Sequence, residues 1–134
     1  MELHLPAVVL VLMLAASIDC ASYTEFLNRH VKPGMAASEC NKVMTDRKIN
    51  SFFSCKPINT FIKAEGSVVA EVCDAKGTHL TDNLYKSVDE FDVIDCVKKN
   101  QFLGCEYTGE AKKLRVIVIC DDKKKPIHFE RVEA

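Results

Sequence analysis

The stretch Cys55-Lys56-Pro57-Ile58-Asn59-Thr60-Phe61 (CKPINTF) is the most informative part of this chain. Its second half predicts a short strand over residues 59–63. Two other stretches are notable: Phe26–His30 (FLNRH), upstream, and Pro126–Glu130 (PIHFE), near the end. A lone histidine is usually structural or solvated, and so is a lysine beside a cysteine. The interpretation therefore rests on the three stretches together.

The N-terminus has the composition of a secretory signal peptide. Residues 6–16 (PAVVLVLMLAA) form an apolar run that is too short to span a bilayer, and small residues follow it. The preceding MELHLP lacks the usual lysine or arginine. We expect residues 1–20 to be a signal peptide, cleaved after Ser17 or after Cys20. Residues 21–134 then form one secreted, extracellular domain without a membrane span.

The mature domain is close to neutral. The 134-residue chain has 18 Lys and Arg against 19 Asp and Glu. Cleavage after Cys20 removes Glu2 and Asp19 and leaves a formal charge of +1, whereas cleavage after Ser17 keeps Asp19 and leaves zero. Net charge alone therefore gives no strong nonspecific attraction to nucleic acid or anionic membranes.

Two local basic groups remain: Arg47-Lys48, and Lys112, Lys113 and Arg115 with Lys123–Lys125. These residues either lie in solvated loops or form a surface that attracts the RNA backbone or directs the protein to the nucleus or a receptor. Neither group is dense enough for the sequence to decide.

Cysteine usage is the second strong constraint on the fold. Of seven cysteines, six remain when Cys20 is set aside: Cys40, Cys55, Cys73, Cys96, Cys105 and Cys120. In a small secreted domain this even set predicts three disulfides, although spacing does not choose their pairing. The chain has no C-x-x-C spacing, so neither a zinc ribbon nor a redox pair is indicated. We expect no metal ion and no cofactor.

Apolar periodicity predicts helices in the first half of the chain and strands in the second. The predicted helices run from Tyr23 to Val31 with Ser22 or Thr24 as N-cap, from Ala36 or Ser38 to about Arg47, and over 67–73 after a turn at Gly66. The β-rich runs contain Val88–Ile94, Tyr107, Leu114–Cys120 and Ile127–Val132, and turns are expected at Gly77, 82–83, 100–104, Gly109 and 121–126. Helices followed by antiparallel strands indicate an α+β fold.

The three stretches together resemble the pancreatic ribonuclease (ribonuclease A) superfamily. CKPINTF matches its signature C-K-x-x-N-T-F, FLNRH resembles its N-terminal helix ending in a catalytic histidine, and PIHF resembles its C-terminal strand with a second histidine. YKSVDEFDVIDC, CEY and LRVIVIC resemble its β half. The similarity extends over residues 26–132.

The resemblance implies three short helices in the N-terminal half and a bent antiparallel β-sheet. It also implies the disulfides Cys40–Cys96, Cys55–Cys105 and Cys73–Cys120. The fourth disulfide of the pancreatic enzymes is missing, because residues 74–84 contain no cysteine. In this respect the chain resembles angiogenins and the three-disulfide ribonucleases of non-mammalian vertebrates.

The implied activity is metal-independent RNA cleavage on the 3' side of pyrimidines. The ribose 2'-hydroxyl must lose a proton while the leaving 5'-oxygen gains one, and histidines suit both roles. The resemblance assigns His30 as general base and His128 as general acid, while Lys56 stabilises the charged phosphorane. A 2',3'-cyclic phosphate forms first and is then hydrolysed.

Base selection is implied for Thr60, which pairs with a pyrimidine through its N–H and its hydroxyl. Phe129 and Ile58 bound the base, and Phe129 N–H is a further phosphate donor. Asp95 matches the acid that tunes Thr60. Asn59, inside the signature, is also placed at the substrate site.

Two residues depart from the family pattern. Arg29 replaces a usual Gln, and it either contacts a phosphate or lowers the pKa of His30 through like charge. Glu130 replaces a usual Asp and is one methylene longer, so a looser hold on the His128 ring is expected.

The implied partners are an RNA substrate and a cell-surface receptor or a ribonuclease inhibitor, with the protein itself a monomer. Two functions stay open: an RNA-degrading enzyme, and an angiogenin-like signalling or host-defence protein with weak ribonuclease activity. Sequence does not choose between them.

Overall fold

Within the described residues, three short helices and a bent antiparallel sheet make up an α+β fold. The computed structural model describes residues 22–99 and 104–134. The helices are α2 (Tyr23–His30), α3 (Cys40–Asp46) and α4 (Gly66–Ala70). A 3-10 turn, η1 (Ala37–Glu39), leads into α3, and another, η2 (Glu71–Cys73), continues α4. The predicted signal peptide, with Cys20, lies outside the described residues.

Helix α2 begins at a side-chain cap and ends against the sheet. The Ser22 hydroxyl accepts a hydrogen bond from Glu25 N–H at 3.1 Å, so Ser22 is the N-cap. Phe26 and His30, four residues apart, form its buried face. Lys32 N–H then donates to Ile62 O at 3.0 Å, which attaches the end of the helix segment to the first strand.

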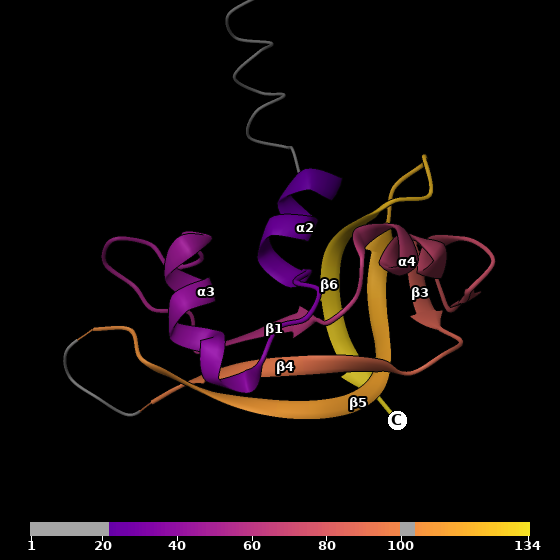
Figure 1. The fold of residues 1–134 in the computed structure, drawn as a ribbon. Helices are drawn as coiled ribbons and strands as arrows, with labels where there is room; N and C mark the ends of the chain where they lie inside the picture. Colours follow the sequence, from indigo (N-terminus) through magenta and orange to yellow (C-terminus); the bar gives the residue numbers. More distant parts are fainter. Residues whose placement is uncertain (1–21, 100–103) are drawn as a thin grey trace, which may run out of the picture.

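The sheet is organised around one long strand. The strands are β1 (Ile58–Ile62), β2 (Gly77–His79), β3 (Leu84–Ser87), β4 (Phe91–Lys98), β5 (Tyr107–Cys120) and β6 (Pro126–Glu133). Their order is β1-β4-β5-β3-β2, and β6 also pairs with β5. The first half of β5 pairs with β4, and its second half pairs with β3 and β6. Figure 1 shows the bend along β5, with α2 above it between α3 and α4.

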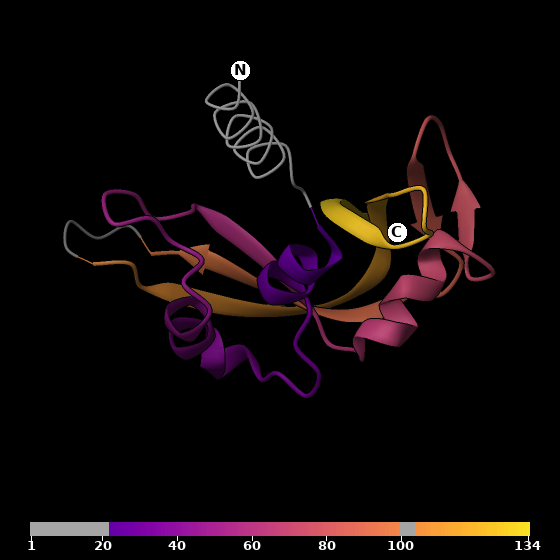
Figure 2. The ribbon, with the colours of Figure 1, turned by 90° about the horizontal axis from the view of Figure 1, so that it is seen from above.

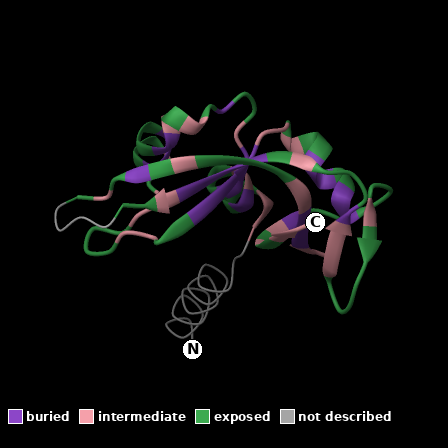
Figure 3. Ribbon diagram, turned by 90° about the horizontal axis from the view of Figure 1, so that it is seen from below, coloured by how far each residue is buried: buried purple, intermediate pink, exposed green. Residues whose placement is uncertain are grey.

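Two apolar clusters fill the two halves of the bent sheet. One contains Phe26 of α2, Ile62 of β1 and Val118 of β5. The other contains Met44 of α3 with Phe61 and other residues of the sheet. Figure 2 shows α2 lying between α3 and α4 from above, and Figure 3 shows the buried residues along the middle of the strands. The α2 helix is therefore held over the bend of the sheet.

Three disulfides join the two halves of the sequence. The pairs are Cys40–Cys96, Cys55–Cys105 and Cys73–Cys120, as the family resemblance implied. Their sequence separations are 56, 50 and 47 residues. Each is worth roughly 4 kcal/mol if it acts by restricting the unfolded chain.

The turn predicted at Gly109 was wrong. Gly109 lies inside β5 opposite Cys96, and a Cβ there would collide with the carbonyl of Ala37. The turn predicted at Gly77 is confirmed, because residues 74–76 form a turn and Gly77 N–H donates to Asp74 O at 3.3 Å. Gly77 then begins β2, and a Cβ there would collide with the carbonyl of Val72. Both glycines permit close approach of another backbone segment, and at Gly109 this replaces the predicted turn. Val88, expected in a strand, lies between β3 and β4 and is exposed.

No helix within residues 22–99 or 104–134 is both long and apolar enough to cross a membrane.

Candidate active site

His30 is buried at the end of α2 and bonded to the edge of the sheet. Its Nδ1 atom lies 2.9 Å from the carbonyl oxygen of Thr60. Because a carbonyl oxygen only accepts, Nδ1 carries the proton and Nε2 of the neutral ring has a free lone pair. The ring is stacked on Phe129, with centroids 5.1 Å apart and an interplanar angle of 28°. The neutral His30 ring is therefore fixed with Nε2 as its basic atom.

Burial lowers the pKa of His30 from 6.5 to about 4. The hydrogen bond to Thr60 opposes this change, whereas the positive charges of Lys56, His128 and Arg29 add to it. A histidine that is neutral at physiological pH can accept a proton, as a general base must. The charge of Arg29 lowers the pKa of His30, which is one of the two roles predicted for Arg29 from the sequence.

Thr60 presents its main-chain polar groups at the free edge of the sheet. It lies on β1, which is the edge strand, opposite Asp95 of β4. Its carbonyl faces His30, and in a strand the N–H and C=O of one residue point to the same side. Thr60 N–H therefore faces the same edge as the histidine. Ile58 lies two residues earlier on the same face of β1 and is 49% exposed.

The Thr60 hydroxyl donates to Asp95 Oδ1 at 2.6 Å. Asp95 is buried, so this contact is shielded from solvent. Its other oxygen, Oδ2, accepts from Lys112 Nζ of β5 at 2.8 Å. Asp95, which the family resemblance places beside Thr60, is thus in contact with it. Lys112, which the sequence did not predict at this site, is in turn in contact with Asp95.

Lys56 is half-buried beside the same histidine. Its ammonium group donates to Asn59 Oδ1 at 2.7 Å, and Asn59 Nδ2 donates to Arg29 O at 2.9 Å. Burial, with a smaller contribution from the charge of Arg29, lowers the pKa of Lys56. The Asn59 side chain thus connects Lys56 to the end of α2, and both of its polar atoms bond to protein groups.

The backbone of Lys56 is held separately. Asn50 Oδ1 accepts from Lys56 N–H at 2.8 Å, and the Tyr107 hydroxyl lies 2.7 Å from Lys56 O. No sequence signal marks Asn50 or Tyr107 for this role, although Asn50 lies only six residues before Lys56; Tyr107 lies 51 residues after it.

His128 and Phe129 lie on β6, opposite Ile119 and Val118 of β5. A register shift separates Ile117 from Val118 and another separates Ile119 from Cys120; such irregularities change the direction of neighbouring side chains. The His128 side chain is 58% exposed, unlike the buried His30. Its charge contributes to the low pKa of His30, and the ring of Phe129, the next residue of β6, stacks on the His30 ring.

Glu130 and Arg29, the two departures from the family pattern, occupy the margin of the site. Glu130 Oε2 lies 3.6 Å from His128 Nε2, which is longer than a hydrogen bond. This geometry agrees with the looser contact expected of the longer side chain. Arg29 Nε pairs with Glu25 Oε2 at 2.9 Å, and both side chains are more than half exposed.

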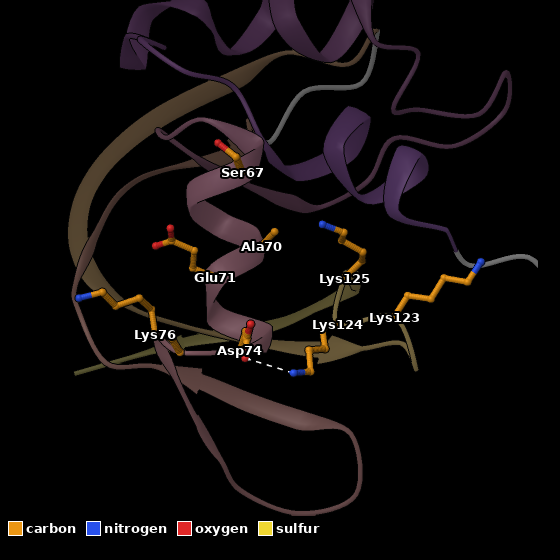
Figure 4. Close-up of a pocket in the computed structure, with 9 residues that line it drawn as sticks. Ser67, Ala70, Glu71, Asp74, Lys76, Lys123, Lys124 and Lys125 are labelled. Carbon is orange, nitrogen blue, oxygen red and sulfur yellow. Dashed lines mark hydrogen bonds and ion pairs between the residues drawn. The ribbon is translucent and has the colours of Figure 1, made fainter.

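A separate hollow lies between α4 and the turn joining β5 to β6. It has a volume of about 470 Å³ and is lined by Lys76 and Lys123–Lys125 together with Glu71 and Asp74. Figure 4 shows these side chains around α4, with Lys124 paired to Asp74 at 3.4 Å. Lys123–Lys125, which belong to the second basic group of the sequence, therefore form one side of this pocket. Lys125 lies three residues before His128 in the chain.

Among residues 22–99 and 104–134, no group of three or more His, Cys, Asp or Glu is placed to hold a metal ion. The groups gathered at the site are instead two imidazoles and an ammonium ion. One imidazole is buried and neutral, the other is exposed, and the cation is beside the buried one. Such a set can move protons on two sides of an anionic centre and stabilise added negative charge.

Comparison with known proteins gives the same picture. The profile of the family described as "Pancreatic ribonuclease" matches residues 21–130. "Ribonuclease-like 3" of Danio rerio is 34% identical, with 98% of this chain and 97% of the relative covered. "Angiogenin" of Mus musculus is 32% identical, covering 84% and 79%.

Among solved structures, "RNASE ZF-3E" superposes with a TM-score of 0.76 at 37% identity. The superposition covers 84% of this chain and 96% of that one. The similarity therefore includes the whole described fold as well as the signature stretches. The chain belongs to the pancreatic ribonuclease family and is a ribonuclease.

Proposed function

We propose that this protein is a secreted endoribonuclease that cleaves RNA on the 3' side of pyrimidines without a metal ion. The observation that carries the proposal is the hydrogen bond from His30 Nδ1 to Thr60 O. It joins the residue proposed to start the reaction to the residue proposed to select the base. A nucleotide whose base is held at Thr60 thus has its ribose brought toward His30.

In the first step, His30 Nε2 removes the proton of the ribose 2'-hydroxyl. The 2'-oxygen attacks the adjacent phosphorus while His128 gives a proton to the departing 5'-oxygen. A 2',3'-cyclic phosphate and a free 5'-hydroxyl result. Water then opens the cyclic phosphate, with His128 as base and His30 as acid. Each proton transfer contributes roughly a hundred- to ten-thousand-fold to the rate.

Lys56 stabilises the negative charge that the phosphorane gains over the ground state, and Phe129 N–H is proposed as a second donor. Because these groups supply the acid, the base and the compensating charge, no step requires a metal ion or cofactor. DNA lacks the 2'-hydroxyl nucleophile, so we expect no DNA cleavage.

The hydrogen bonds of Asn59 support a positioning role for this residue. Its amide joins Lys56 to the Arg29 carbonyl. We therefore propose that Asn59 orients Lys56 and does not contact RNA directly. Arg29 remains a proposed phosphate contact, which requires it to leave Glu25.

The proposal is tested with purified protein and the dinucleotides UpA, CpA and ApA in EDTA. Cleavage of UpA and CpA with ApA nearly untouched is the expected result. Cleavage that requires added Mg²⁺, or equal cutting of ApA, would contradict it.

Secretion is proposed from residues 1–20, with cleavage after Cys20 favoured because Cys20 is an unpaired seventh thiol if retained. Mass spectrometry of the protein from culture medium should find an N-terminus at Ala21. An N-terminus at Ile18, with a free thiol or a disulfide dimer, would place the cleavage after Ser17.

A second candidate is an angiogenin-like signalling or host-defence role with weak catalysis. The 32% identity to mouse "Angiogenin" is the observation that favours it. Comparing RNA turnover with responses of endothelial cells and bacteria distinguishes the two: cell responses at low turnover favour the second. Binding to a receptor or a ribonuclease inhibitor belongs to that candidate. Monomeric behaviour in solution is expected under both.

A further inference from the structure

The Asp95 carboxylate has both oxygens occupied. Oδ1 accepts from the Thr60 hydroxyl at 2.6 Å and Oδ2 accepts from Lys112 Nζ at 2.8 Å. The Asp95 side chain is 5% exposed, whereas Lys112 is 41% exposed and reaches in from the surface. Another carboxylate near Lys112 is that of Glu110, at 3.8 Å. The Asp95 bond is therefore the shorter of these two contacts of Lys112.

Thr60, Asp95 and Lys112 lie in a row across three neighbouring strands, β1, β4 and β5. Thr60 of β1 lies opposite Asp95 of β4, which lies opposite Glu110 of β5. Lys112 is two residues beyond Glu110 and therefore on the same face of β5. Diagonal neighbours of this kind are within reach of a long side chain. The register of the sheet thus brings a surface cation into indirect contact with Thr60.

The contacts of Asp95 with Thr60 and Lys112 fix the direction in which the Thr60 hydroxyl points its proton. An ionised carboxylate only accepts, so the single hydroxyl proton is directed at Asp95. The oxygen of Thr60 then has only lone pairs to offer to a base. Uracil carries an N–H at position N3 and can donate to them. Cytosine has a lone pair at N3, and binds this hydroxyl only if its proton leaves Asp95.

We propose that Lys112 is a positioning residue that makes the site favour uracil over cytosine. Its ammonium group binds Oδ2 and thereby holds Oδ1 of Asp95 toward the Thr60 hydroxyl. Without that contact the Asp95 carboxylate can rotate away from Thr60, and the Thr60 hydroxyl is then free to donate to cytosine. The inference rests on the proposed function, because it requires Thr60 to bind the base.

The test compares kcat/KM for UpA and CpA in the intact protein and in Lys112→Met. The intact protein should cut UpA several-fold faster than CpA. In Lys112→Met the ratio should fall by about three- to tenfold, the size expected when a hydrogen bond to a charged group is weakened. Lys112→Arg keeps the cation and should keep most of the ratio.

Two controls separate selection from general damage. Lys113→Met removes the same charge from the opposite face of β5 and should leave the ratio unchanged. If Lys112 acts through Asp95, adding Lys112→Met to Asp95→Ala should change the ratio no further than Asp95→Ala alone. If Lys112 had a purely structural role, Lys112→Met would lower the Tm and kcat/KM for both UpA and CpA together, without changing their ratio.

The outcomes distinguish this inference from the proposed function. If both dinucleotides are cut and Lys112→Met leaves the ratio unchanged, the role of Lys112 is overturned and the ribonuclease mechanism stands. Equal or faster cutting of CpA by the intact protein also overturns it. If the intact protein cuts neither dinucleotide, both proposals fail.

Discussion

His30 Nδ1 lies 2.9 Å from the main-chain oxygen of Thr60. Because the acceptor is a main-chain atom, the bond survives any change of the Thr60 side chain that leaves the strand intact. We therefore expect the proposed base selection by Thr60 and the proposed proton transfer by His30 to be altered independently of each other.

The first prediction concerns Thr60→Gly, which removes the hydroxyl and widens the base site. Discrimination against purines should fall by about 1 to 3 kcal/mol, because the hydrogen bond that selects a pyrimidine is lost. The measurement is kcat/KM for UpA, CpA and ApA. Thr60→Ser retains the hydroxyl and serves as the matched control. Unchanged discrimination in Thr60→Gly would exclude Thr60 as the selector.

The second prediction concerns the titration of His30. Because burial lowers its pKa from 6.5 to about 4, the His30 ring should titrate near pH 4 by NMR. Lys56→Met removes a nearby positive charge and should raise this midpoint. A midpoint near 6.5 in the intact protein would show that the ring is solvated.

The same shift gives a pH dependence of stability. A histidine that is neutral in the folded state favours folding fully above its unfolded pKa of about 6.5. This contribution should decline as the pH falls from 6.5 to about 4, by up to roughly 3 kcal/mol in total. Urea unfolding of the intact protein and of His30→Gln across this range should show a smaller pH dependence in the variant.

The third prediction concerns Glu130. At 3.6 Å from His128 Nε2 it makes no direct hydrogen bond, and the His128 side chain is solvent-exposed. Glu130→Ala should lower kcat/KM less than about tenfold, since solvent can replace most of so weak a contact. A loss as large as that of His128→Ala would mean that Glu130 is needed to orient the ring.

The fourth prediction concerns the pocket lined by Lys76 and Lys123–Lys125. Long RNA extends beyond the cleaved bond, whereas UpA does not, so these lysines should affect only the longer substrate. Replacing Lys123 and Lys125 by Ala should slow cleavage of poly(U) several-fold and reduce its salt dependence. UpA cleavage should stay unchanged.

Lys42→Ala provides the control, because Lys42 is an exposed lysine on α3 that pairs with Asp46. Equal loss on UpA and poly(U) after the double replacement would point to damage at His128 rather than to RNA steering.

The sequence predicted those parts of the fold in which a local pattern specifies the structure. Ser22 was one of two predicted N-caps, and Phe26 belongs to the apolar periodicity that predicted α2; the burial of His30 was not predicted. The disulfide pairing was expected only through the family resemblance, because spacing does not select it. The helices in the first half and the strands in the second followed from periodicity.

Features that depend on tertiary contact were not predictable. The sequence predicts a turn at Gly109 because an isolated glycine gives the same local signal as a turn, whereas in the structure Gly109 lets η1 approach β5. Lys112 could be linked to Asp95 only after the register of β4 and β5 was known. Lys76 and Lys124 are far apart in the sequence and line the same pocket only in the folded chain.

The most direct test of the proposed mechanism is the product formed from UpA in EDTA by the intact protein, His30→Ala, Lys56→Ala and His128→Ala. The intact protein should release uridine 2',3'-cyclic phosphate, detected by ³¹P NMR before its hydrolysis. Each variant should form it at least about a hundred-fold more slowly. Full activity in either histidine variant, or cleavage without a cyclic intermediate, would contradict the mechanism.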